Sequence, residues 1–277
     1  SLPVCQGVPM DFTDISSGSP TTWSWDFGDA ASGSNTSSLQ NPSHSFSTSG
    51  NFTITISVTN AGGCQSISQQ NVSVNPNPVI SISDDAICEG ATANIIGPSG
   101  FAIYNWNNSE VTQSISVAPI ISTNYSLTVT DNNGCQGTDA MTLIVNAPPT
   151  VVMGPNQVIC EGTSANLSAT GGALYEWNPG AIVGQNVSVS PAANTNYVVT
   201  VTDGNGCIST GQMSVTVNPM PVVAVSSDMG VCKGESATIS IVNGSGAYLW
   251  TPGNYVTPSI TVAPLTTTSY TVTVSDA

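Results

Sequence analysis

Few side chains in this sequence of 277 residues could do chemistry, because only 6% of its residues are charged. His44 is the single histidine, so any Ser-His-Asp triad or histidine-based metal site must include it. Two carboxylates can serve as the acid and base of a glycosidase, and the candidate pairs are Asp26 with Asp29 and Asp84 with Asp85. All four stand where turns are expected, and we interpret them as turn residues. We predict that the chain is not an enzyme.

Calcium is the metal that the composition favours. The sequence has 16 carboxylates against one lysine and no arginine, and its net charge is −15, so divalent cations are natural counter-ions. Asp26 and Asp29 lie at the end of an expected strand and are the candidate calcium ligands. The segments 131–134 and 203–206 resemble calcium-binding loops but lack the loop of about 12 residues and its final Glu, so we interpret them as turns. We expect no other cofactor.

The charge balance also excludes several partners. Nucleic-acid binding depends on Lys and Arg at phosphates, and docking on anionic lipid depends on basic clusters. Lys233 is the only such residue here. The sequence also has no apolar run of about 18 residues, which a membrane-spanning helix needs. We therefore expect neither nucleic-acid binding nor membrane insertion.

The elements that must position these residues are strands. Val, Ile and Thr alternate with polar residues between Gly- and Pro-rich turns, which predicts an all-β chain. Prolines interrupt the chain after Asn75, at Pro148-Pro149 and at Pro219. They divide it into four units: residues 1–75, 76–148, 149–219 and a truncated unit at 220–277. In the second unit we expect strands at 79–83, 91–96, 114–117 and 141–145, besides two strands that contain tyrosines.

The last three units are copies of one module. Cys-x-Gly recurs at Cys88, Cys160 and Cys232, each 72 residues after the last (160−88 and 232−160). A tyrosine strand then leads to an Asp-x-Asn-Gly turn and a cysteine, at 125–135 and 197–207, and a third copy stops at Ala277. A regular period of this kind indicates a repeat array. We expect the first and last units to be incomplete.

The aromatic residues also recur and are expected in the cores. A tryptophan on the third strand and a tyrosine at the start of a later strand match the buried tryptophan and tyrosine corner of immunoglobulin-like sandwiches. A carbohydrate-stacking role is the alternative. The expected core residues are Trp25, Trp106, Trp177, Trp250, Tyr125, Tyr197 and Tyr270.

Two pairing schemes for the seven cysteines remain open. Pairing within units gives Cys5–Cys64, Cys88–Cys135 and Cys160–Cys207; pairing between units gives Cys5–Cys135 and Cys88–Cys207. Topology favours the second scheme. The Cys-x-Gly turn and the last hairpin of a sandwich lie at opposite ends, separated by a strand of about 20 Å, whereas a disulfide needs Cα atoms within about 7 Å. In a head-to-tail array the two ends of successive units meet.

The first unit resembles the polycystic-kidney-disease (PKD) repeat. It contains Trp23-Ser-Trp-Asp-Phe-Gly-Asp29, then Asn41-Pro-Ser-His-Ser-Phe46, then the strand from Gly50 to Val58. Ala30 stands where the family usually has glycine, and the strand before Cys5 is almost absent. Residues 76–277 resemble the bacterial immunoglobulin-like repeats of very large surface proteins of gliding Bacteroidota. These resemblances imply β-sandwiches, extracellular location, export by the type IX route and a part in gliding or attachment.

Two functions follow as hypotheses. The first is a non-catalytic structural or adhesive stalk at the cell surface, a segment of a large adhesin or filament, whose partners are further repeats or other copies of itself. The alternative is a set of carbohydrate- or protein-binding modules attached to a secreted enzyme. That alternative predicts exposed, coplanar aromatic rings, and the aromatic residues, 6% of the chain, fall mostly at core positions. The sequence does not identify a glycan or protein ligand.

Overall fold

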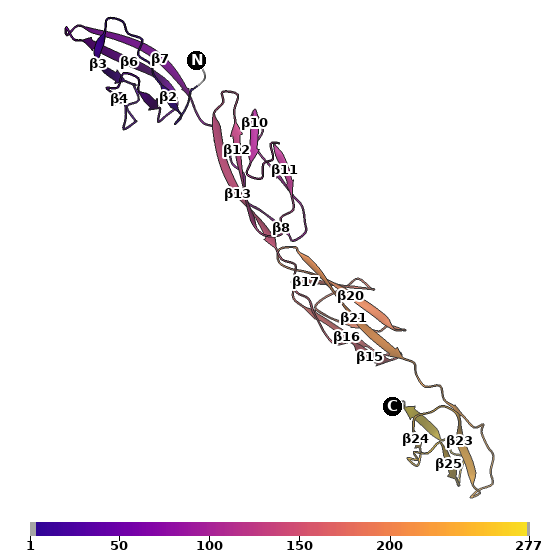
Figure 1. Cartoon of the computed structure of the whole chain (residues 1–277). Helices are drawn as coiled ribbons and strands as arrows, with labels where there is room; N and C mark the ends of the chain where they lie inside the picture. Colours follow the sequence, from indigo (N-terminus) through magenta and orange to yellow (C-terminus); the bar gives the residue numbers. More distant parts are fainter. Residues whose placement is uncertain (1–3, 276–277) are drawn as a thin grey trace. The chain divides into compact units, whose positions relative to one another are not determined.

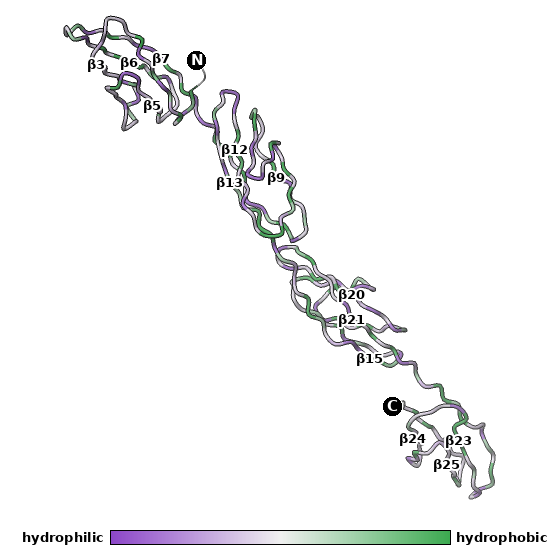
Figure 2. The backbone as a smooth tube through the Cα atoms, viewed as in Figure 1, coloured by the Kyte–Doolittle hydropathy of each residue, from purple (hydrophilic) through white to green (hydrophobic). Residues whose placement is uncertain are grey.

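A computed structural model describes residues 4–275, and these form strands, turns and loops with no helix (Figure 1). The described residues therefore contain no helix that could cross a membrane. The chain divides into two compact units, Ser1–Pro148 and Pro149–Ala277, and each is described by itself. Hydrophobic and hydrophilic residues are interspersed along the strands (Figure 2), as expected for sheets with one buried face.

The buried side chains form four separate clusters, within residues 4–74, 80–143, 151–217 and 239–272. We call the corresponding segments the first to fourth domains. Each has two layers of strands, so the chain is an array of immunoglobulin-like and PKD-like β-sandwiches. Because each cluster belongs to one domain, each sandwich buries its own core.

The first domain packs a five-stranded sheet on a two-stranded one. The large sheet has the order β1 (Val4–Cys5), β7 (Gln65–Asn75), β6 (Gly50–Asn60), β3 (Pro20–Asp26) and β4 (Thr36–Ser37). The small sheet pairs β2 (Pro9–Asp11) with β5 (Ser43–Ser45). Trp25, Phe27 and Phe46 are buried between the layers.

The second domain has a four-stranded and a two-stranded sheet. The first has the order β10 (Ile103–Trp106), β12 (Thr123–Thr130), β13 (Gln136–Asn146) and β8 (Asp85–Cys88). The second pairs β11 (Ser114–Val117) with β9 (Ala93–Ile96). Residues 79–83, expected as a strand, are not one. Pro76 and Pro78 bring no N–H donors to a ladder, and the Ile82 N–H donates to the Asp139 carboxylate at 2.8 Å.

The third domain repeats this plan with more strands. One sheet has the order β15 (Gln157–Cys160), β21 (Ile208–Asn218), β20 (Thr195–Thr202), β17 (Leu174–Asn178) and β18 (Ile182–Val183). The other contains β14 (Val152–Met153), β16 (Ala165–Thr170) and β19 (Asn186–Val189).

The fourth domain is smaller in the described residues. It pairs β22 (Ala224–Val225), β23 (Ala237–Asn243) and β25 (Ser259–Val262) in one sheet. The other sheet contains β24 (Ala247–Thr251) and β26 (Thr271–Ser275).

One long strand closes each of the first three domains. These strands, β7, β13 and β21, each have 11 residues. Each follows directly on a hairpin cysteine, and its last residue is an asparagine that pairs with a second cysteine from a short parallel strand. The parallel partners are Cys5 with Asn75, Cys88 with Asn146 and Cys160 with Asn218. The two cysteines of each of these domains therefore stand at opposite ends of its closing strand.

Candidate functional site

The only buried charged side chain among the described residues is Asp29, which is 1% exposed and lies beside the only histidine. The strand β3 ends at Asp26, and the chain turns at Gly28, where φ is +71°. A Cβ at Gly28 would lie 2.7 Å from the Thr53 carbonyl oxygen, so this turn requires glycine both for its backbone and for its close contact. The turn directs the Asp29 carboxylate toward β5 and the residues after it.

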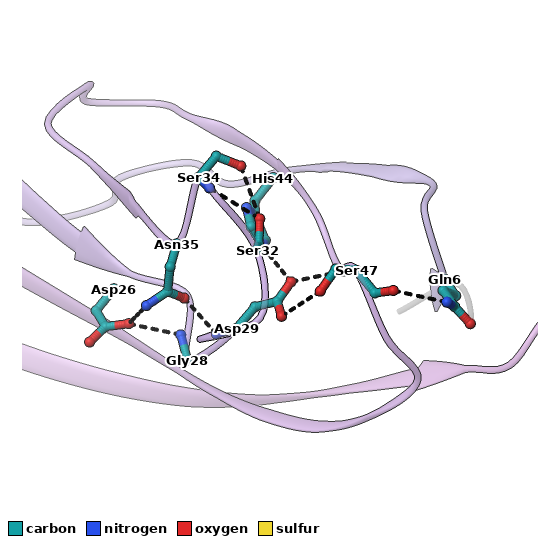
Figure 3. Close-up of polar contacts among 9 residues, drawn as sticks. All are labelled: Gln6, Asp26, Gly28, Asp29, Ser32, Ser34, Asn35, His44 and Ser47. Carbon is teal, nitrogen blue, oxygen red and sulfur yellow. Dashed lines mark hydrogen bonds and ion pairs between the residues drawn. The ribbon is translucent and has the colours of Figure 1, made fainter.

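Three donors converge on this carboxylate (Figure 3). The Ser47 N–H donates to Oδ2 and the Ser47 hydroxyl to Oδ1, each at 2.8 Å, and His44 Nε2 lies 3.3 Å from Oδ2. The His44 ring stacks on Phe27 with centroids 4.2 Å apart and meets the edge of Phe46. Burial raises the pKa of Asp29, but the hydrogen bonds from Ser47 and His44 outweigh it, so the pKa lies below its ordinary value of 3.8.

This arrangement differs from that of a hydrolase. In a catalytic triad the serine donates to the histidine, which takes its proton, and the aspartate orients the histidine from the other side. Here the Ser47 hydroxyl donates to Asp29 itself. The Ser47 hydroxyl hydrogen is thus bonded to the carboxylate and not to His44, so His44 does not activate this hydroxyl. The cluster joins β5 to the turn after β3 and serves as a structural clasp.

Asp26 has a different task. Its Oδ1 accepts the Gly28 N–H and the Asn35 amide, each at 2.9 Å, and Asn35 Oδ1 in turn accepts the Asp29 N–H. Figure 3 shows this chain of contacts from Asp26 through Asn35 to Asp29. Because Asp29 already accepts three bonds and is buried, the two carboxylates do not fit a calcium ion bound between them. The described residues also contain no group of three or more His, Cys, Asp or Glu side chains placed to hold a metal.

The hairpin turns hold the cysteine that directly precedes each long strand. Asp131 Oδ1 accepts the N–H groups of Asn133 and Cys135, each at 2.8 Å, and Gly134 has φ +85°. Asp203 binds the N–H groups of Asn205 and Cys207 in the same way. Both are Asx-turns, in which the aspartate side chain accepts backbone N–H groups two and four residues further along the chain.

The first domain has the same turn, which the sequence reasoning missed. Asn60 Oδ1 accepts the N–H groups of Gly62 and Cys64, each at 3.0 Å. The shared signal is Asx-x-x-Gly-Cys, with Asn60 in place of aspartate. Searching for Asx rather than Asp would have found it.

The structure joins Cys5 to Cys135, with Cα atoms 5.4 Å apart. Cys64, Cys160 and Cys232 are free and exposed in the described part of the chain. The structure therefore contradicts pairing within units. Cys5–Cys64 and Cys88–Cys135 each need a cysteine that is already in the Cys5–Cys135 bond. Cys160–Cys207 is not formed, because Cys160 is free. A strand of 11 residues spans about 36 Å, and this separation keeps the two cysteines of one domain apart.

The core tryptophans are buried and share one polar contact. Trp25, Trp106, Trp177 and Trp250 lie in the four clusters, and each indole N–H donates to a backbone carbonyl, that of Leu39, Thr112, Gly184 and Thr257 respectively. Tyr125 and Tyr197 are also buried, and Tyr270 is partly buried. Burial raises the pKa of Tyr197. Rings held in this way face the cores, where a sugar cannot stack on them.

Comparison with known proteins supports the β-sandwich description. Residues 3–74 match the family model of the PKD domain. No curated protein matches the sequence.

The chain also matches several solved structures at low identity. One is a calcium-stabilised adhesin with which an Antarctic bacterium binds ice (14% identity, 95% of this chain and 86% of that one, TM-score 0.34). A second is a 1.5-MDa bacterial ice-binding adhesin (16%, 76% and 92%, TM-score 0.33). A third is the extracellular domains 3–5 of Drosophila OTK (10%, 78% and 93%, TM-score 0.31). At these identities and TM-scores we base no argument on the likeness.

Proposed function

We propose that this chain is a non-catalytic segment of an extracellular stalk, part of a large adhesin or filament on a bacterial cell surface. The observation that carries the proposal is the covalent joint between the first and second domains, Cys5–Cys135. A bond between successive domains stabilises their connection and shapes no pocket. Disulfides also persist in oxidising, extracellular surroundings.

The chemistry of the side chains supports a structural role. The only histidine is held with Ser47 by a buried carboxylate, which leaves no activated nucleophile in the first domain. The net charge of −15 suits a surface exposed to solvent.

We also propose that the same joint recurs along the array. Cys88 corresponds in sequence to Cys5, and Cys207 to Cys135, so we propose a Cys88–Cys207 bond. Cys64, Cys160 and Cys232 would then bond to further repeats of the same protein or to other copies of it. Export by the type IX route and a part in gliding or attachment rest on the sequence resemblance of residues 76–277.

Surface labelling of intact cells of the source bacterium tests the stalk. An antibody raised against residues 149–219 should label unbroken cells, and deletion of the segment should reduce their attachment to surfaces. Labelling that needs prior lysis of the cells would refute the proposal. An antibody against a cytoplasmic protein controls for broken cells.

A second candidate function, ligand binding by the first domain, is favoured by one open groove of about 600 Å³. Phe12 and other apolar side chains supply part of the lining, while Asp11, Asp14 and Gln70 supply polar groups, two of them carboxylates. No basic side chain is present to hold an anion, so the groove suits a neutral, hydroxyl-rich ligand such as a glycan. Binding of the full chain to a glycan array, lost in Gln70→Ala and kept in Ser214→Ala of the third domain, would support it; no binding to any glycan would refute it.

A further inference from the structure

The two ends of the Cys5–Cys135 bond occupy special places along the chain. Cys5 lies near the beginning of the first domain, and Cys135 directly precedes the last long strand of the second. The two residues are 130 positions apart, so the bond closes a loop that contains the core of the first domain and the strands β8 to β12. The chain beyond Cys135 continues into β13.

This connectivity gives tension a short covalent route. Tension that enters before Cys5 and leaves after β13 passes through the sulfur–sulfur bond and then along β13. A closed loop cannot be pulled out past the bond that closes it. With Cys5–Cys135 as the only cross-link, residues 6–134 therefore add no length to a chain stretched from its ends while the bond is intact.

The strand β13 is suited to the second part of this route. A strand rises about 3.3 Å per residue, and a fully extended chain reaches at most about 3.3–3.6 Å per residue. β13 is thus almost fully extended already and lengthens little under load. It is held between β12, through eight paired positions, and β8, through four, and its Leu143 side chain is completely buried.

Contacts at the joint hold the first part of the route in place. The Gln6 N–H donates to the Asn75 carbonyl at 3.0 Å, and the Gln6 side chain donates to the Ser47 carbonyl at 2.8 Å. The Asn77 amide donates to the Gln6 carbonyl at 3.1 Å. Ser47 also holds Asp29, so the buried cluster extends to the residue beside Cys5, as Figure 3 shows.

We propose that the Cys5–Cys135 bond and β13 together form a tension path that bypasses the folded cores of the first two domains. The path makes this part of the chain inextensible when oxidised and extensible when reduced. Reduction by a dithiol supplies two electrons and two protons; the protein disulfide becomes two thiols, and the dithiol becomes a cyclic disulfide. The inference rests on the proposed stalk, in which tension is the natural load.

Stretching single molecules in optical tweezers tests the path. The full chain is held by peptide tags at its two ends, and only Cys5 and Cys135 are kept. The other cysteines are replaced in C64S, C88S, C160S, C207S and C232S. Addition of dithiothreitol should lengthen the fully stretched molecule by about 430–470 Å, which is the length of 130 residues. The matched control adds C5S and C135S, and its stretched length should not respond to dithiothreitol.

The result that overturns the inference is a stretched length that dithiothreitol leaves unchanged while both cysteines are present. Because the serine replacements could disturb folding, the natural chain with all seven cysteines gives a second readout. Peptide mapping without reduction should recover the Cys5 and Cys135 peptides joined, and their recovery as separate or otherwise paired peptides also overturns it. Neither result depends on where the protein is located, so surface labelling of cells still tests the stalk separately.

Discussion

Replacement of Asp29 by asparagine is the most informative perturbation of the first domain. Both carboxylate oxygens of Asp29 accept hydrogen bonds, whereas an amide has one oxygen and turns its NH₂ group toward a donor. Hydrogen bonds to a charged group contribute about 1.5–3 kcal/mol each. Ser47 is exposed and can turn to water, but His44 is 3% exposed and cannot. We therefore expect Asp29→Asn to reduce the free energy of unfolding of this domain by about 1.5–3 kcal/mol.

Hydrogen exchange of the full chain, read by mass spectrometry, measures this loss in one domain at a time. A loss of about 1.5–3 kcal/mol accelerates exchange by unfolding about 10- to 150-fold in the β6 and β7 peptides. Peptides from residues 149–218 serve as the internal control and should not change. Asp11→Asn, which alters an exposed carboxylate of the same domain, is the matched control variant.

The same residue predicts a pH dependence. The folded pKa of Asp29 is below its ordinary value of 3.8, so its contribution to stability is complete above that value. The contribution is lost as the pH falls from there through the folded pKa. The exchange difference between the natural chain and Asp29→Asn should therefore shrink in acid. Equal protection of the two proteins at pH 7 would show that the cluster stabilises nothing and would refute the reasoning.

Three further predictions concern the joint, the metal and the thiols. Gly137→Ala should loosen the link between the first two domains, because a Cβ there would clash with the Pro78 carbonyl oxygen, and hydrogen exchange at residues 76–84 should accelerate. The control is Gly204→Ala, whose Cβ meets nothing within 4 Å and should have no effect. Unchanged exchange in both variants would contradict the contact. Calorimetric titration of the first-domain carboxylates with calcium should give no heat of binding, and a saturable signal lost on Asp26→Asn would show that the geometry misled us. As an isolated monomer, the chain should take up three maleimide groups, one at each free and exposed cysteine. Uptake of five would contradict the proposed second bridge, and uptake of seven would show that no disulfide forms.

The sequence by itself determined what depends on neighbouring residues. Alternation of Val, Ile and Thr gives strands, and Asx-x-x-Gly gives the hairpin turns, because the side chain of the Asx residue binds N–H groups only two and four positions further on. The period of the Cys-x-Gly motif likewise gave the repeats, and the recurring tryptophans were correctly expected in the cores. It assigned the strand at 79–83 wrongly, since prolines and a side-chain acceptor replace the ladder there.

Only the tertiary structure decided which distant residues meet. The parallel pairing of Cys5 with Asn75 joins positions from the two ends of a domain, and no local pattern specifies it. That register places Cys5 and Cys64 at opposite ends of β7, and Cys88 and Cys135 at opposite ends of β13, and Cys5 meets Cys135 of the second domain. Asp29 is a similar case. Its position in the sequence suggested a metal ligand, but packing against β5 gives it Ser47 and His44 as hydrogen-bond partners. The physical reason is that a buried carboxylate is stable only where hydrogen-bond donors surround it.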